Sequence, residues 1–82
     1  MGENYFKGLY GTCSIARFME GEISENQVDA IKEGITRCWE RKIDSSPLSF
    51  QEKEEQKRQM KNNADAYNHG IKDALRMNGR LM

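Results

Sequence analysis

Proline is nearly absent from this chain, in which Pro47 is the only one among 82 residues, and no glycine-rich turn follows a strand-like run. The scarcity of proline permits long helices, and the lack of such a turn argues against a phosphate-binding loop. No run approaches the roughly 20 apolar residues of a transmembrane helix. The first twenty residues include Glu3, Lys7 and Arg17, which do not fit a secretion signal. We therefore expect a cytoplasmic protein.

Residues that bind metals or act as nucleophiles are also scarce. Cys13, Cys38 and His69 are the only thiol and imidazole side chains, and their spacing does not match the close ligand pairs of zinc sites. We predict no metal, no cofactor, no catalytic residues and no enzymatic activity. Two buried thiols are expected in a reducing cytoplasm, and a disulfide between them is the alternative. A Cys38–His69 nucleophile pair is less favoured, because Cys38 lies on an apolar helix stripe.

His69 has a carboxylate four residues away on each side, at Asp65 and Asp73. On a helix this spacing places the three side chains on one face. We expect a surface ion-pair cluster there. A pH-sensitive site is the alternative, because both carboxylates would favour the protonated imidazole.

Apolar side chains recur every three or four residues in three segments, which predicts helices at residues 4–20, 24–43 and 47–78. A chain of this length forms one domain, so residues 1–82 are expected to be a single helical domain. The predicted fold class is all-α: a small three-helix arrangement with a long C-terminal helix. Hydrophobic residues make up 37% of the chain, which suits a small core of modest stability.

The first predicted helix is the least regular of the three. Gly8 and Gly11 weaken it, so we expect either one kinked helix or two short ones, and small side chains there would let a neighbouring helix approach closely. Gly21 is expected to end this helix. Its aromatic residues are expected in the core, and a stacking platform for nucleic-acid bases is the weaker alternative. These residues are Tyr5, Phe6 and Tyr10.

The second predicted helix has the clearest boundaries. Ser24 and Gln27 have the spacing of a capping box, and residues 44–47 favour a turn. An apolar stripe runs along this helix and is expected to face the core. The stripe consists of Val28, Ile31, Ile35, Cys38, Trp39 and Ile43.

The third predicted helix divides into two halves. It begins at Ser46 or at Ser49, where a second capping-box spacing occurs. Residues 60–75 carry an apolar stripe and are expected to pack on the other helices. Residues 51–59 contain no apolar side chain, so we expect residues 50–59 to overhang the other helices or to lie against a second copy.

Two further predictions concern the same helix and its end. Asparagine is a poor helix former, so a break in the helix is expected at Asn62 and Asn63 if it breaks anywhere. Asn78 and Gly79 are expected to end the helix. The last two residues are expected to fold back onto the helices.

Charge is balanced over the chain but unevenly distributed along it. Residues 1–56 hold 7 Lys and Arg against 11 Asp and Glu, a balance of −4, and residues 57–82 hold 6 against 2, a balance of +4. In order of preference, this division predicts attraction between helices, a head-to-tail contact between copies, or a basic face for an acidic partner.

Two classes of function fit these features. The preferred hypothesis is a small, non-catalytic protein-binding regulator or adaptor that acts through a helical surface, either as a monomer or as a homodimer. Trp39 is its first anchor if that side chain proves exposed. The residues predicted to bind the partner are Trp39, Arg41, Glu54, Lys57, Arg58 and Lys61.

The alternative is a nucleic-acid-binding protein that uses the basic C-terminal third. Phosphate contacts require cations gathered on one face. The candidates are Lys57, Arg58, Lys61, Lys72, Arg76 and Arg80. The net charge of zero and the absence of helix-turn-helix spacing make this the weaker hypothesis.

Overall fold

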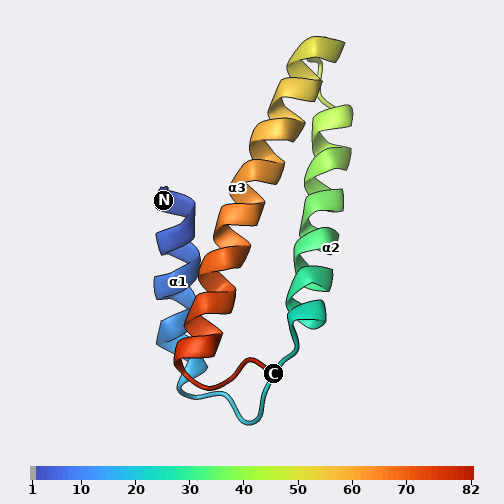
Figure 1. The fold of residues 1–82 in the computed structure, drawn as a ribbon. Coiled ribbons are helices and arrows are strands. Elements are labelled where there is room, and N and C mark those ends of the chain that lie inside the picture. The colour runs from blue at the N-terminus through green and yellow to red at the C-terminus, as the bar shows by residue number, and fades with distance from the viewer. Residues whose placement is uncertain (1) are drawn as a thin grey trace.

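Three helices make up the fold of this chain in a computed structural model that describes residues 2–82 (Figure 1). Helix α1 (Glu3–Ala16) lies along the C-terminal half of α3 (Phe50–Met77), and α2 (Glu25–Asp44) forms a long hairpin with α3. No Cα atom of α1 lies within 8 Å of one in α2 in the described chain, so α3 alone connects the two. The all-α prediction with a long C-terminal helix is confirmed.

The helix boundaries differ from the predicted ones mainly at α1. This helix is a single unbroken one through both of its glycines, and it ends at Ala16 rather than near residue 20. Gly21, which was expected to end it, has a positive φ of 87° within the linker instead. The reason is that Met19 and Ile23 pack against the core from beyond the helix, which a straight continuation of α1 would prevent. Helix α3 runs through Asn62 and Asn63 without a break.

Both long helices begin at serine caps, as their sequences predict. The Ser24 hydroxyl accepts a hydrogen bond from the Gln27 backbone at 3.2 Å, and the Gln27 side chain accepts one from the Ser24 backbone at 2.9 Å. This reciprocal pair is a complete capping box. Ser49 caps α3 by accepting from the Glu52 backbone at 3.2 Å. Residues 47–48 therefore lie before the helix, which settles the start of α3 at Phe50.

A Schellman motif ends α3 and turns the chain back on itself. Gly79 has a φ of 68°, a left-handed conformation that glycine adopts without strain, and the Arg80 backbone donates to the Leu75 carbonyl at 2.8 Å. The tail then pairs with the α1–α2 linker, where Ile23 donates to Arg80 at 2.8 Å and accepts from Met82 at 2.9 Å. The tail thus folds back as predicted, and Leu81 packs against the core.

Two interlocking glycines bring α1 and α3 into close contact. A Cβ atom on Gly70 would lie 2.7 Å from the backbone nitrogen of Leu9, and one on Gly8 would lie 3.3 Å from that of Ile71. Both glycines are buried. Gly8 thus plays the close-packing role predicted for it, whereas Gly11 meets nothing within 4 Å.

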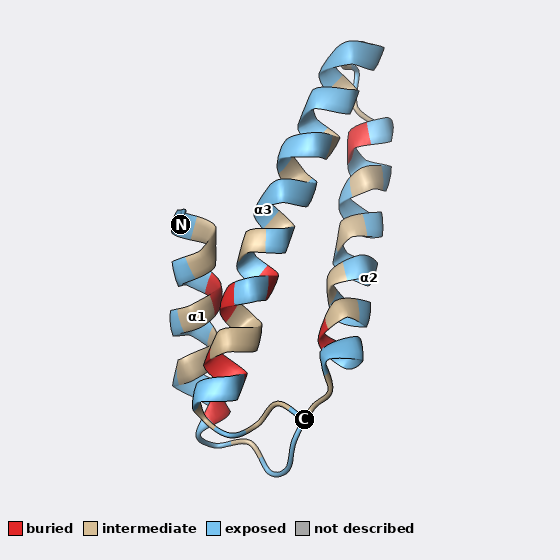
Figure 2. Cartoon of the chain, in the orientation of Figure 1, coloured by how far each residue is buried: buried red, intermediate tan, exposed pale blue. Residues whose placement is uncertain are grey.

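The core is small and lies at one end of the molecule. Ala16, Val28 and Leu75 form its buried cluster, and no large side chain of the described residues is fully buried. Figure 2 shows buried positions only in short patches along the helices. The Cα extents of 44 × 23 × 16 Å are broad and thin. The fold is therefore close to a single layer of helices, with α3 in the middle.

Candidate protein-binding groove

An apolar groove of ≈ 1010 Å³ runs over α3 between α1 and α2. Its floor is the α3 stripe that the sequence predicts to be the packing half of that helix. Its walls come from one face of each neighbouring helix. Side chains that line it include Ile15 on α1, Ile31, Ile35 and Trp39 on α2, and Met60, Ala64, Tyr67 and Ile71 on α3.

The α2 wall is unusually exposed for an apolar stripe. Ile31, Ile35 and Trp39 are 59%, 54% and 50% exposed, whereas Val28 and Ile43 at the two ends are buried. The prediction that the whole stripe faces the core is therefore wrong for its middle. The cause is the distance between α1 and α2, no two Cα atoms of which lie within 8 Å in the described chain, so that α3 alone packs along the middle of this face.

Trp39 was expected to act as an anchor if its side chain proved exposed. Half of its surface is exposed, and it lines the groove. The Lys42 ammonium lies 4.7 Å from the centroid of its ring, a cation–π contact that holds one side of the indole. Large, half-exposed tryptophans in a pocket are typical of residues that contribute most to binding energy.

The groove is nearly free of charge. Among residues 2–82, Lys32 is its one charged lining residue, and its ammonium lies 2.9 Å from the Asp65 carboxylate. This contact raises the pKa of Lys32 above its ordinary value, mainly through the hydrogen bond. The remaining polar lining is neutral and consists largely of amides and hydroxyls: Asn4, Thr12, Thr36, Gln56, Gln59, Asn63 and Asn68.

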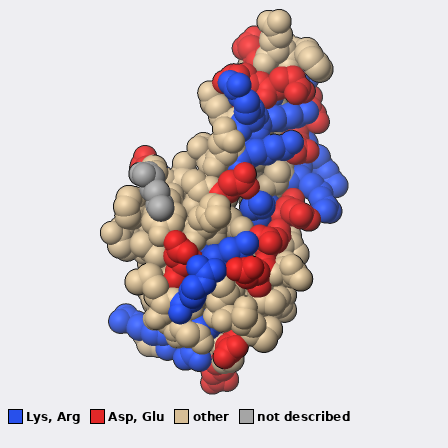
Figure 3. Space-filling model, viewed as in Figure 1, with Lys and Arg blue, Asp and Glu red and all other residues tan. Residues whose placement is uncertain are grey.

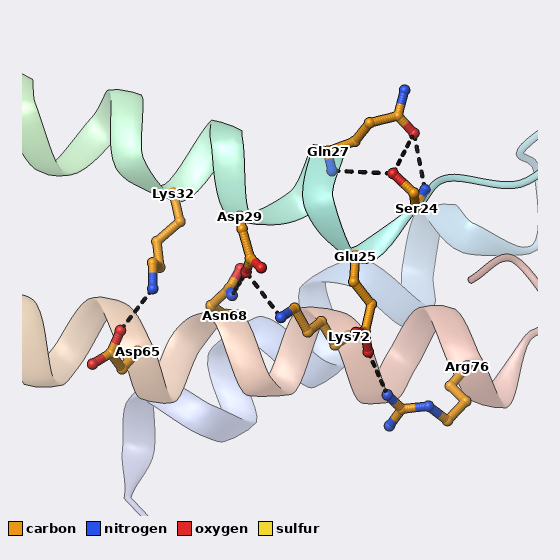
Figure 4. A network of polar contacts seen from close by, with 9 residues as sticks. All are labelled: Ser24, Glu25, Gln27, Asp29, Lys32, Asp65, Asn68, Lys72 and Arg76. Carbon is orange, nitrogen blue, oxygen red and sulfur yellow. Dashed lines mark hydrogen bonds and ion pairs between the residues drawn. The ribbon is translucent and has the colours of Figure 1, made fainter. Parts of the chain in front are cut away.

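A ladder of ion pairs joins α2 to α3. Its acidic partners are on α2 and its basic partners on α3. Successive acidic residues are four, eleven and four positions apart along α2, and their basic partners have the same spacing in the reverse direction along α3. Such steps keep side chains on one helix face. Figure 3 shows the two signs of charge alternating along this seam, and Figure 4 shows its lower part. The pairs are Glu25–Arg76 at 3.1 Å, Asp29–Lys72 at 2.8 Å, Glu40–Lys61 at 3.3 Å and Asp44–Lys57 at 2.6 Å.

The ladder accounts for the uneven charge of the sequence. Attraction between helices was the preferred explanation, and these contacts support it. They also show that the predicted overhang at residues 50–59 is wrong, since Asp44 binds both Lys57 and, through its carbonyl, Lys53 at 2.9 Å. The first half of α3 needs no apolar stripe there, because α2 contacts it through ion pairs and lysine stems.

The residues predicted to bind a partner do not form one site. Trp39 lines the groove, but Lys57 and Lys61 belong to the ladder. Arg58 pairs with Glu55 of its own helix. Arg41 and Glu54 are exposed and line neither the groove nor the ladder.

The six cations of the nucleic-acid alternative are all engaged within the chain. Four of them are ladder partners, namely Lys57, Lys61, Lys72 and Arg76. Arg58 pairs with Glu55, and Arg76 also contacts Asp73 at 3.0 Å. Arg80 donates to the Ala16 carbonyl at 3.3 Å. A phosphate backbone would have to compete with these contacts.

Two other sequence interpretations are corrected by the structure. Cys38 is exposed rather than buried, because its side of the stripe lies outside the α2–α3 contact. His69 makes no ion pair within residues 2–82, since Asp65 contacts Lys32 while Asp73 contacts Tyr5 and Arg76. Cys13 and Cys38 are both unpaired thiols.

The aromatic residues of α1 were expected in the core, and two of the three are not. Phe6 and Tyr10 are 42% and 65% exposed, and their rings stack with centroids 5.8 Å apart. Tyr5 is half-buried, and its hydroxyl donates to Asp73 at 2.5 Å, which raises the pKa of Tyr5. The close contact of Gly8 and Gly70 turns the Tyr5 and Leu9 face of α1 toward α3 and leaves the Phe6 and Tyr10 face outside.

The stability of the ladder should depend on pH through Asp29. Its carboxylate accepts from Lys72 and from Asn68, and Lys32 lies nearby, so its pKa falls below the ordinary value of 3.8. A lowered pKa stabilises the fold above about 3.8, and this contribution is lost as the pH falls through the folded-state pKa. We expect Asp29→Asn to be less stable than the natural chain at neutral pH.

The difference in unfolding free energy between the two proteins should shrink as the pH falls below about 3.8, which urea unfolding across the pH range would measure. Glu33→Gln on the same helix is the control, because Glu33 forms only an exposed pair with Arg37 at 3.6 Å. A difference for Asp29→Asn that stays constant down to about pH 2.5 would contradict the assignment.

Within residues 2–82, no group of three or more histidine, cysteine or acidic side chains is placed to hold a metal ion. No helix of the described chain is long and apolar enough to cross a membrane. Comparisons with protein-family models, with curated proteins and with solved structures find no match to this chain.

Proposed function

We propose that this chain is a small, non-catalytic protein-binding regulator or adaptor, whose apolar groove receives a helical surface of another polypeptide. The observation that carries the proposal is the half-exposed row of Ile31, Ile35 and Trp39 along a groove of ≈ 1010 Å³. A contiguous row of large apolar side chains exposed in a groove supports an interaction site.

The shape of the groove favours a helix as the bound element. It follows α2 from Val28 to Ile43, a length of about 24 Å at about 1.5 Å of rise per residue. Recognition of an amphipathic helix uses apolar contacts spaced three or four residues apart, which is the spacing of the α2 wall.

The chemistry of the lining supports binding rather than catalysis. Of the described residues that line it, only Lys32 and Tyr67 have ionisable side chains, and Lys32 is held by Asp65. General acid–base catalysis needs a titratable group within reach of the reacting atoms and poised near the working pH. The nucleic-acid alternative has less support, because the cations it requires are engaged within the chain.

Affinity capture with matched baits tests this function. The natural chain, Ile35→Glu and Phe50→Glu would each be used to capture polypeptides from the cell that makes the protein. Phe50 is a suitable control because it is 77% exposed, lies outside the groove and begins α3, where a negative charge is favourable. We expect the same bound polypeptide with the natural chain and Phe50→Glu, and its loss with Ile35→Glu.

Capture of an untagged copy of the chain itself counts as a bound polypeptide in this experiment. If the three baits capture the same polypeptides in equal amounts, the groove is not the binding site and the proposal fails.

A further inference from the structure

We propose that the polypeptide bound in the groove is a second copy of this chain, packed face to face about a two-fold axis. This inference rests on the proposed function and names the partner of the same groove. In the resulting pair, the exposed row of Ile31, Ile35 and Trp39 on each copy enters the groove of the other.

The thinness of the fold is the first reason. Stable domains bury the apolar faces of their elements between two packed layers, yet this chain has a Cα extent of only 16 Å across its helices. Helix α1 leaves the middle of the apolar face of α2 uncovered, since no Cα atom of α1 lies within 8 Å of one in α2 in the described chain. A second copy supplies the missing layer with a face of matching length and width.

The area of that face is the second reason. The rectangle that encloses the broad side measures 44 × 23 Å between Cα positions, which sets an upper limit of roughly 1,000 Å² on the contact area of each copy. A stable interface of standard size buries about 800 Å² on each partner. A face-to-face pair that uses most of this side would reach that range, whereas a single short peptide in the groove would cover only part of the side.

Charge is the third reason. A two-fold axis places the same surface on both sides of an interface, so any unpaired charge near the axis meets its own sign. The groove avoids this cost, because its one charged side chain is neutralised by Asp65. Outside the groove, four acidic side chains of α2 are paired with basic side chains of α3 in the ladder. A strongly charged partner would find nothing in the groove to pair with.

The two walls complete the fit. On α2, the three exposed side chains are spaced by four residues and form a ridge. On α1, Ile15 is 61% exposed and faces the same groove from the other side. A copy turned about the two-fold axis would place its α2 ridge between these walls, with its Trp39 removed from water.

Light scattering after size exclusion tests the pair directly. We expect a mass of about 19 kDa, twice the chain's 9.5 kDa, for the natural protein and for Phe50→Glu. Ile35→Glu should have the mass of one chain and retain its helical circular dichroism. Because each copy carries the substitution, its effect counts twice. We expect the dissociation constant of the dimer to rise by at least about 100-fold.

Trp39 is the only tryptophan and gives a second measurement that needs no substitution. Its emission should move to longer wavelength as the natural protein is diluted from about 200 to about 1 µM, because dissociation exposes the indole to water. This readout remains decisive if Ile35→Glu fails to fold.

Other outcomes overturn the pair. A mass of one chain throughout with constant Trp39 emission would exclude a second copy, and a dimer unaffected by Ile35→Glu would place its interface elsewhere. A larger assembly would exclude a closed pair. If the protein is monomeric but captures a different polypeptide through Ile35, the proposed function stands and only the second copy is wrong.

Discussion

Replacing Gly70 by alanine is expected to lower the free energy of unfolding by about 3 kcal/mol, at the upper end of the usual cost of overpacking. The new Cβ atom would lie 2.7 Å from the Leu9 nitrogen and closer still to the Tyr5 carbonyl oxygen. These are backbone atoms of a helix and cannot rotate away, so α1 and α3 must separate. Urea unfolding followed by circular dichroism, at one protein concentration, measures the loss.

Gly34→Ala is the matched control for Gly70→Ala. Gly34 lies inside α2 with nothing within 4 Å of the Cβ position, so alanine there should stabilise the chain by about 0.5–1 kcal/mol through helix propensity alone. Gly8→Ala should behave like Gly70→Ala, because its Cβ would meet the Tyr67 carbonyl. If Gly70→Ala were as stable as Gly34→Ala, the close contact of α1 with α3 would be wrong.

The dependence of the free energy of unfolding on urea concentration shows whether Gly70→Ala detaches α1 from α3. If Gly70→Ala detaches α1, the variant's folded state already exposes the α1 contact, and less surface is exposed when it unfolds. The dependence of free energy on urea should then be weaker than in the natural chain. A shifted midpoint with an unchanged slope would indicate that the two helices yield slightly and stay in contact.

The helices were predictable from the sequence because their signals are local. The Ser24 and Ser49 caps and the three- and four-residue spacing of apolar side chains depend only on neighbours within a turn or two. The end of α1 was not predictable in this way. It depends on Met19 and Ile23 reaching a core that includes Leu75, which is far away in the sequence.

The groove could be predicted only in part, because periodicity shows that a face is apolar but not what covers it. The α2 row was recognised as a stripe and assigned to the core. Exposure of Ile31, Ile35 and Trp39 follows from the length and position of α1, whose 14 residues lie along one side of the 28-residue α3 without reaching α2. Nothing in the sequence warned of this, because the predicted first helix at residues 4–20 is nearly as long as the second at residues 24–43.

The charge ladder illustrates the same limit. Opposite balances of charge in the two parts of the chain predicted attraction between helices, but not which residues pair. Pairing requires the antiparallel register of α2 and α3, which the short turn after Asp44 sets. Exposed ion pairs contribute at most about 1 kcal/mol each. The ladder therefore adds little stability, and its pairing follows the register that the turn sets.

Leu75→Ala is the other substitution expected to have a large effect, with a loss of roughly 2–4 kcal/mol in the free energy of unfolding. Leu75 is only 3% exposed and packs with Ala16 and Val28, so it joins the end of α1 to the start of α2. Ile23 and Leu81 pack against the same cluster. Removing three carbon atoms here weakens the contacts of all three helices and of the tail at once.

Met77→Ala is the control for Leu75→Ala, because Met77 lies two residues further along α3 and is 74% exposed. Truncation of Met77 should change the free energy of unfolding by no more than about 0.5 kcal/mol.

The groove extends to Leu75, so side chains around it can partly collapse into the space that Leu75→Ala leaves. This keeps the expected loss of stability below the largest cavity costs. Leu75 is only 3% exposed at the end of the groove, so the pairing of two folded copies should depend on Ile35 more than on Leu75. A variant that loses the dimer without losing stability would show that Leu75 acts at the interface and not in the core.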